Sequence, residues 1–309
     1  MIPRPRWLPA ATLLLVGAGW GLTTPLVKLA VEGGYRPFGI IFWQLVIGAA
    51  ILWPVQAVRR QRLPLGRPHL RVYAALAALG TLFPNAATYR AVEQLPAGLV
   101  TILLSSVPMF AFAIALALGD ERLGPGRLAG LVLGLAGVAM IVGPEAALPD
   151  RAMLGFVLLA LVAPLVYGVE GNYMARAVVP GLDPLAVVLG ASLVGLPVAA
   201  GLALVTGQWI TPAPPWGMAD LAVFASSAVD TTIYGAYVWL VARAGAVFAA
   251  QAAYLVTGFG VLWSVALLGE SYSGWVWAAM GVMLAGLALV QPRADSALVP
   301  AAPAAKHVR

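Results

Sequence analysis

Long apolar runs separated by short polar segments dominate the sequence. A helix needs about 20 mostly apolar residues to cross the roughly 30 Å hydrocarbon layer of a membrane, and ten runs along the 309 residues are of about this length. In chain order they are Trp7–Val31, Pro37–Val58, Val72–Ala91, Ala97–Leu118, Pro125–Val142, Met153–Ala175, Pro184–Val205, Gly217–Val241, Ala246–Leu268 and Gly274–Val290. The pattern therefore predicts an all-α membrane protein with ten transmembrane helices.

Turn-forming residues mark the boundaries between these runs. Gly33-Gly34, Gly143-Pro144 and Pro180-Gly181 each lie just beyond the end of an apolar run, and such dipeptides are typical of turns and loops. The first run follows Arg4 and Arg6, as the core of a signal peptide would. It is too long for such a core and leads directly into further runs, so we expect it to be retained as the first helix.

The composition excludes several classes of protein. Hydrophobic residues make up 61% of the chain and charged residues 10%, whereas a soluble domain carries about 25% charged residues. This scarcity of charge excludes a soluble enzyme, a secreted disulfide scaffold and a disordered protein. The sequence has no cysteine, and its two histidines, His69 and His307, lie far apart. We therefore expect neither a metal centre nor a cofactor.

The basic residues are distributed unevenly over the predicted loops. The net charge of +6 would suit nucleic-acid binding, but in a membrane protein basic residues first report orientation. Ten spans place 14 of the 18 Lys and Arg residues on the side of both termini, and the other four are Lys28, Arg36, Arg90 and Arg151. We therefore predict a protein of the bacterial inner (plasma) membrane with both termini in the cytoplasm, and no nucleic-acid partner.

The two halves of the sequence resemble each other. A shift of 149 residues superposes Gly119-Asp120-Glu121 on Leu268-Gly269-Glu270, and Leu135-Ala136-Gly137 on Leu284-Ala285-Gly286. Because five is an odd number of spans, the second half must insert upside down relative to the first, as in many secondary transporters. The predicted organisation is a first repeat over 1–143, a connecting loop over 144–152, a second repeat over 153–292 and a disordered cytoplasmic tail over 293–309.

Motifs at matching places in the two halves carry a family resemblance. They are Trp20-Gly21 with Lys28, Asp120-Glu121-Arg122-Leu123 followed by Gly130 and Gly137, and Gly269-Glu270 followed by Gly286. With these motifs the chain resembles the drug/metabolite transporter superfamily, specifically its EamA-type members. The resemblance implies export of small metabolites, and exporters of amino acids, with an aromatic branch, are among its common functions. Span two departs from the family, because Gln44 stands where such proteins often carry an arginine.

Polar and aromatic residues recur at helical spacing in six of the predicted spans, where each stripe can share one helix face. The predicted substrate-binding residues are Trp20, Thr24, Asn85, Thr88, Ser105, Tyr167, Asp230, Tyr234, Tyr237, Gln251 and Tyr254, and the predicted hinges are Pro108 and Gly258. Each has a structural alternative. A hydroxyl such as that of Ser105 can bond its own helix backbone, a buried tyrosine can serve packing, and Pro108 can simply kink its helix.

Two carboxylates inside the spans are the first candidates for function, because ionisable groups are costly within a membrane. Asp230, near the middle of span eight, can hold a substrate ammonium, carry a coupling proton or bond tyrosine hydroxyls. Glu170, in span six, can carry the proton or reach Arg176 and solvent. Lys28, near one end of span one, can attract a substrate carboxylate or extend toward the membrane surface.

These residue types together suit a small zwitterion with a large apolar or aromatic side chain. We therefore expect a monomeric or weakly dimeric secondary transporter, not an enzyme, that exports amino acids or related metabolites across the bilayer by alternating access. The sequence has no P-loop pattern, so either the substrate gradient or protons must drive transport. Carriers of phosphorylated sugars or of drugs and cations are the nearest alternatives, and a lipid-acting intramembrane enzyme and a channel are further ones.

Overall fold

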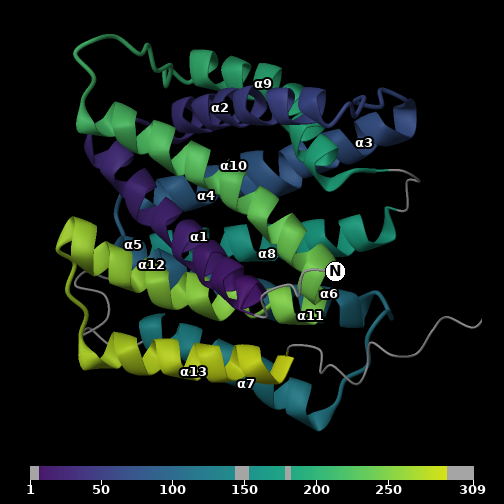
Figure 1. Cartoon of the computed structure of the whole chain (residues 1–309). Coiled ribbons are helices and arrows are strands. Elements are labelled where there is room, and N and C mark those ends of the chain that lie inside the picture. The colour runs from purple at the N-terminus through teal and green to yellow at the C-terminus, as the bar shows by residue number, and fades with distance from the viewer. Residues whose placement is uncertain (1–6, 143–152, 178–181, 291–309) are drawn as a thin grey trace, which may run out of the picture.

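The computed structural model describes residues 7–142, 153–177 and 182–290, and within these ranges every regular element is a helix (Figure 1). The connecting loop expected over 144–152 and the tail expected over 293–309 lie outside the described residues. The helices group into ten membrane-spanning segments, numbered here as spans one to ten in chain order, which confirms the predicted fold class.

The first half contains spans one to five. Its elements are α1 (Leu8–Glu32), α2 (Pro37–Val58), α3 (Arg67–Leu76), the π-helix η1 (Ala77–Leu82), α4 (Phe83–Val92), α5 (Ala97–Leu104), α6 (Val107–Ala117) and α7 (Pro125–Val142). The second half contains spans six to ten. Its elements are α8 (Leu154–Arg176), α9 (Pro184–Val205), α10 (Met218–Ala244), α11 (Ala246–Ala249), α12 (Ala252–Leu268) and α13 (Gly274–Val290). Helices α2, α7, α9 and α13 begin and end at the residues that the apolar pattern predicts.

Two spans of the first half depart from a regular α-helix next to a proline. A proline has no N–H and its ring clashes with the carbonyl four residues earlier, so it disfavours a continuous α-helix. In span four, α5 ends at Leu104, the residue four positions before Pro108, and α6 resumes at Val107. In span three, Pro84 follows η1, and the π-helix accommodates the missing hydrogen bond by widening one turn.

Span nine is also interrupted, between α11 and α12 at Ala250 and Gln251. Spans four and nine occupy the same place in the two repeats, so both halves carry a discontinuous helix at equivalent positions. In transporters built from inverted repeats, interrupted helices in corresponding positions point to the binding site.

Pseudo-two-fold symmetry governs the packing of the helices. Helix α2 packs on α9, α7 on α13 and α5 on α12, so each of these pairs joins equivalent spans of the two repeats. The pairing of α1 with α10 is matched by that of α8 with α4, and the pairing of α1 with α12 by that of α8 with α6. Figure 1 shows α2 and α9 at the top, α7 and α13 at the bottom, and α1 and α10 between them.

Helices α7 and α13 pack closely because glycines face each other across their interface. A Cβ atom built on Gly130 would lie 2.8 Å from the carbonyl oxygen of Gly286, and one built on Gly137 would lie 2.2 Å from Cγ of Met283. Only a residue without a side chain allows the two backbones to approach this far, and small residues commonly serve this purpose between membrane helices.

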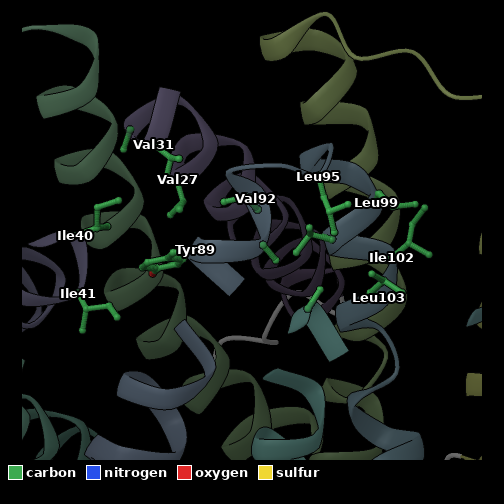
Figure 2. Packing of buried hydrophobic residues seen from close by; sticks show 14 of the residues in the cluster. Val27, Val31, Ile40, Ile41, Tyr89, Val92, Leu95, Leu99, Ile102 and Leu103 are labelled. Atoms are coloured by element: carbon green, nitrogen blue, oxygen red, sulfur yellow. The ribbon is translucent and has the colours of Figure 1, made fainter. Parts of the chain in front are cut away.

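The main hydrophobic core lies where α1, α2, α4 and α5 meet (Figure 2). Its labelled side chains are Val27, Val31, Ile40, Ile41, Tyr89, Val92, Leu95, Leu99, Ile102 and Leu103, all at most 9% exposed. Large apolar side chains also cover the outside of the bundle, among them Leu14, Leu135 and Leu158, each more than half exposed. An apolar exterior around a packed interior suits a protein that is surrounded by lipid.

An ion pair joins α2 to α9 at the face predicted to be cytoplasmic. The Arg59 guanidinium donates to both carboxylate oxygens of Asp183, at 3.0 and 2.7 Å, and the Gln56 amide donates to one of them at 3.1 Å. Asp183 is also the N-cap of α9, because it accepts the backbone N–H groups of Leu185 and Ala186. Burial raises the pKa of Asp183, but the hydrogen bonds from Arg59, Ala186 and Gln56 outweigh it and leave this pKa below its usual value.

We expect the substitution Asp183→Asn to make the protein less stable at pH 7 and no less stable in acid. Asparagine is an equally good N-cap, so the variant loses only the charge. Because Arg59 is 40% exposed, solvent screening limits the loss to about 0.5–1 kcal/mol. The folded pKa of Asp183 is lowered, so its contribution is complete above the unfolded value of about 3.9 and disappears as the pH falls through the folded pKa. Thermal unfolding in detergent at pH 7 and pH 3 checks this, and an equal gap between wild type and variant at both values would contradict it.

Candidate functional site

A hydrogen-bonded group of five side chains, here called the polar network, lies between the two halves of the protein. Its centre is Gln44, whose carbonyl oxygen accepts hydrogen bonds from Asn85 Nδ2 at 2.9 Å and from the Tyr89 hydroxyl at 2.7 Å. The amide nitrogen of Gln44 donates to Asp230 Oδ2 at 3.4 Å. The Tyr167 hydroxyl donates to Asn85 Oδ1 at 3.0 Å. The network therefore connects an amide pair to one carboxylate and two phenols.

Four helices position this network, two from each half. Gln44 lies on α2, Tyr167 on α8 and Asp230 on α10, while Asn85 and Tyr89 occupy successive turns of α4. The four helices form a continuous row, because α8 packs on α4, α4 on α2 and α2 on α10. A buried polar group is costly unless it is hydrogen-bonded, so the network helps to fix how the two repeats meet.

The burial of the network is uneven. Asn85 and Tyr89 are both 7% exposed, whereas Asp230 and Tyr167 are only half-buried. Asp230 thus sits among helices near the middle of its span and still keeps accessible surface. An ionisable carboxylate within a membrane span is a candidate binding group.

Aromatic rings surround Asp230. Trp20 of α1 lies beside the carboxylate, and its ring centroid is 5.1 Å from that of Tyr237 on α10. Tyr167 and Tyr234 lie within electrostatic range of both Asp230 and Glu170. The predicted residues Trp20, Tyr167, Asp230, Tyr234, Tyr237 and Asn85 are therefore gathered around one place.

Other predicted residues have different surroundings. Thr24 and Thr88 are buried, at 8% and 6% exposure. The Ser105 hydroxyl donates to the carbonyl of Ile102 in its own helix at 2.6 Å, the structural alternative for this residue. Tyr254 packs against the apolar cluster of Met109 and Phe112. Gln251 is exposed at the interruption of span nine, and Gly258 lies farther along in the continuous helix α12.

Glu170 and Arg176 do not form the ion pair that the sequence allows. Arg176 Nη2 instead lies 2.6 Å from Asp120 Oδ2, in the loop after α6. Glu170 is half-buried and faces η1, since a Cβ atom on Gly80 would lie 3.9 Å from its carboxyl carbon. The second intramembrane acid is thus placed beside the π-helix of span three, and π-helical turns are frequent at functional sites.

Lys28 binds the end of a neighbouring helix. Its Nζ atom donates to the carbonyl oxygens of Val92 at 2.6 Å and Leu95 at 3.2 Å, and the side chain is only 13% exposed. A cation at a helix C-terminus satisfies free carbonyls and interacts favourably with the helix dipole. Lys28 therefore fastens α1 to the end of α4, and its Nζ atom also lies 3.8 Å from the exposed carboxylate of Glu32.

The two glutamates related by the sequence repeat make different contacts. Glu270 accepts the backbone N–H groups of Ala97 at 2.7 Å and Gly98 at 3.2 Å, so it caps the N-terminus of α5 in the other half. Tyr272 joins this contact by donating to Glu270. Glu121, the equivalent residue of the first half, pairs instead with Arg127 of α7.

Two members of the polar network, Gln44 and Tyr89, are absent from the residues predicted from sequence. In the sequence, Gln44 was noted only because family members often carry an arginine at its position. It is also the single polar side chain in the middle of an otherwise apolar span. That isolation was the available signal, because an amide inside a membrane helix needs partners on another helix. Tyr89 carried no such signal, since a tyrosine in a span usually serves packing.

The chemistry available at this place is recognition of a polar ligand. Within the described ranges, no group of three or more acidic or histidine side chains could hold a metal ion. The network offers a carboxylate that can accept an ammonium group, together with hydroxyls and amides that can both donate and accept hydrogen bonds. Its rings offer apolar surface next to these groups.

Comparison with known proteins agrees with this architecture. The model of the EamA-like transporter family matches residues 7–143 and 154–291. The chain is 24% identical over 283 residues to the uncharacterized inner membrane transporter YedA of Escherichia coli (strain K12), covering 88% of this chain and 86% of that protein. It is 28% identical over 155 residues to the uncharacterized transporter YoaV of Bacillus subtilis (strain 168), over 50% of this chain and only 52% of YoaV. One crystal structure, 18% identical, superposes with a TM-score of 0.59 over 90% of this chain and 96% of its own, which supports the fold alone.

Proposed function

This chain belongs to the EamA-like transporter family, and from that membership we propose that it carries small zwitterions, preferentially amino acids with a large apolar or aromatic side chain. It is a multi-pass membrane transporter and not an enzyme. The proposed direction is export across the inner membrane by alternating access. This location is supported by the relative YedA, which is named as an inner membrane transporter.

The polar network carries this proposal. In inverted-repeat transporters the substrate site lies near the middle of the membrane where the halves meet, and the network joins α2 and α4 of one half to α8 and α10 of the other. Asp230 is its one ionisable acid and keeps accessible surface. A substrate ammonium at this carboxylate would be held by a charge-assisted hydrogen bond, while amides and hydroxyls serve the substrate carboxylate.

The aromatic surroundings support a large apolar side chain in the substrate. Trp20 and Tyr237 form a ring pair beside Asp230, and Tyr167 and Tyr234 lie within electrostatic range of both Asp230 and Glu170. Aromatic rings pack favourably against one another in offset or edge-to-face arrangements. Phenylalanine, tyrosine and tryptophan are therefore the first amino acids to test.

The charges near the network argue against an anionic cargo. A carrier of phosphorylated sugars needs several cations at midspan. The groups near the network that can carry a charge are instead the acids Asp230 and Glu170, which would repel a phosphate. Lys28 is held by the carbonyls of Val92 and Leu95. A carrier of organic cations remains the second candidate, because Asp230 and its aromatic neighbours would also suit a cation without a carboxylate.

The interrupted spans support alternating access. Span four is broken next to Pro108 and span nine at Gln251, and α5 packs on α12. Pro108 is the proposed hinge of span four. In span nine the proposed hinge is the interruption at Gln251, because Gly258 lies within the continuous helix α12. Asp230 and Glu170 are the proposed sites of proton coupling.

Reconstituted uptake tests the proposal. Purified protein in liposomes should show saturable counterflow of L-phenylalanine, and an imposed pH gradient should accelerate net flux if protons are coupled. The panel should include quaternary cations and sugar phosphates as competitors. Movement of sugar phosphates alone would contradict a zwitterion carrier, and unsaturated single-channel currents would contradict a carrier of any kind.

A further inference from the structure

A small pocket lies apart from the polar network, at the membrane face predicted to be external. It is formed by the start of α2, the second half of α4 and the segment after α9, and its polar lining consists of Arg36, Arg90, Glu93 and Gln208. Phe38 supplies an apolar wall. Gln208 belongs to the second repeat and the other residues to the first, so the pocket sits on the boundary between the halves.

The charges in this pocket are incompletely paired. The Glu93 side chain is only 4% exposed, and its Oε2 atom takes both cations: Arg36 Nη1 lies 3.3 Å away, and Arg90 Nη1 donates to the same oxygen. Oε1 of Glu93 is buried and has no hydrogen-bond partner among the described residues. Leaving a buried acceptor unpaired is costly. The pocket is therefore lined by a carboxylate that has one paired and one unpaired oxygen.

The two arginines retain the capacity to bind an anion. Their side chains are 53% and 55% exposed, and each approaches Glu93 through one terminal nitrogen. A guanidinium has five N–H donors, so most donors of Arg36 and Arg90 stay available to a ligand carboxylate. The pocket thus places a carboxylate with one unpaired oxygen beside two guanidinium groups that keep donors available.

The walls of the pocket are fixed by contacts between the halves. The backbone N–H of Phe38 donates to Gln208 Oε1 at 3.0 Å, and the Trp43 indole donates to the carbonyl of Ile210 at 3.0 Å. A Cβ atom on Gly39 would lie 2.2 Å from the carbonyl oxygen of Gln208. The absence of a side chain at Gly39 therefore allows the segment after α9 to lie directly on α2.

The pocket lies on the same two helices as the polar network. Arg90 follows Tyr89 directly on α4, and Phe38 precedes Gln44 on α2 by six residues. With a rise of 1.5 Å per residue, this separation is about 9 Å along the axis of α2. A substrate that moves from the network toward the predicted outer face along α2 and α4 would meet the pocket next.

We propose that this pocket is a second binding site for a zwitterionic amino acid, occupied at the external face. The substrate ammonium donates to the Glu93 carboxylate, the substrate carboxylate accepts from Arg36 and Arg90, and the substrate side chain lies against Phe38. The inference rests on the proposed function, because it assumes that the cargo is a zwitterion. It adds a binding site, outside the polar network, for both charged groups of the substrate.

Counterflow measured separately from each face tests the pocket. The chain has no cysteine, so a single Arg62→Cys substitution in the loop after α2 reports the orientation of the reconstituted protein through an impermeant maleimide. We expect Glu93→Gln to raise the KM for L-phenylalanine about 10-fold at the face of the pocket. The KM at the opposite face should stay within about 2-fold. Glu32→Gln, which removes an exposed carboxylate at the same face, is the matched control and should change neither value.

Substrate analogues that lack one charge test the Glu93 carboxylate and the arginines of the pocket separately. Phenethylamine should compete more weakly from this face after Glu93→Gln, and 3-phenylpropionate after Arg90→Gln, each by about 10-fold. Arg90→Gln also provides a second variant if Glu93→Gln unfolds in detergent. A wild type that moves no amino acid would overturn the proposed function. A wild type that moves L-phenylalanine, with unchanged KM in folded Glu93→Gln and Arg90→Gln, would overturn the pocket alone.

Discussion

Replacing Asp230 by asparagine should lower the kcat/KM for L-phenylalanine by about 10- to 100-fold. Asparagine has nearly the same shape and can still accept the hydrogen bond from Gln44, so the variant removes the charge and keeps the network. Hydrogen bonds to charged groups contribute about 1.5–3 kcal/mol, and each 1.4 kcal/mol corresponds to tenfold in affinity. Initial rates of counterflow over a range of substrate concentrations measure the loss.

The matched control is Asp220→Asn on the same helix. Asp220 lies at the start of α10, pairs with Tyr35 and caps the backbone at Gly217, away from the polar network. Its substitution should leave kcat/KM within about 2-fold, since surface interactions of this kind contribute little. Full flux in Asp230→Asn would remove Asp230 from substrate binding. If that flux is also independent of pH, Asp230 does not carry a coupling proton, and Glu170→Gln becomes the next variant to measure.

The substitution Gly130→Val should destabilise the protein, because it inserts a branched side chain where α7 and α13 are in close contact. The new Cβ atom would lie 2.8 Å from both the Gly286 carbonyl oxygen and Cγ2 of Val290. The oxygen belongs to the backbone of α13, so it cannot turn aside as a flexible side chain would. Overpacking of this kind costs about 1–3 kcal/mol and occasionally more, a large share of the 5–15 kcal/mol typical of a folded domain. Thermal unfolding in detergent reports the loss.

Gly126→Val is the control for this prediction. Gly126 lies one turn earlier on α7, and a Cβ atom there would meet nothing within 4 Å. The two variants share the helix and the cost of a β-branched residue, and they differ in contact with α13. Equal unfolding temperatures for both would show that the approach of α7 to α13 does not depend on Gly130.

The extent of the spans was predictable because length, apolarity and local signals agree. The apolar run of α2 is preceded by Arg36, begins with Pro37 at a favoured first helical position, and is followed by Arg59 and Arg60. All these signals are local, so one sequence is sufficient to read them. The interruptions were harder to predict, because Pro108 is compatible with either a kink or a break, and the neighbouring turns decide between them.

The site was only partly predictable because it depends on contacts between helices. Helical spacing placed Asn85 and Thr88 on one face of span three, and midspan charge selected Asp230. Neither signal reveals which side chain on another helix completes the hydrogen bonds. Gln44 illustrates the limit: a lone amide has no periodic partner in its own span, and its importance arises from α4 and α10 being adjacent to α2.

The unequal contacts of Glu121 and Glu270 bear on how sequence variants in this protein should be interpreted. The two residues occupy equivalent positions of the two repeats, yet Glu270 binds the backbone of the opposite half and Glu121 binds its own neighbour, Arg127. Tolerance of a change at one position is therefore no guide to tolerance at its counterpart. Variant effects need to be scored separately for each repeat, even where the two sequences align.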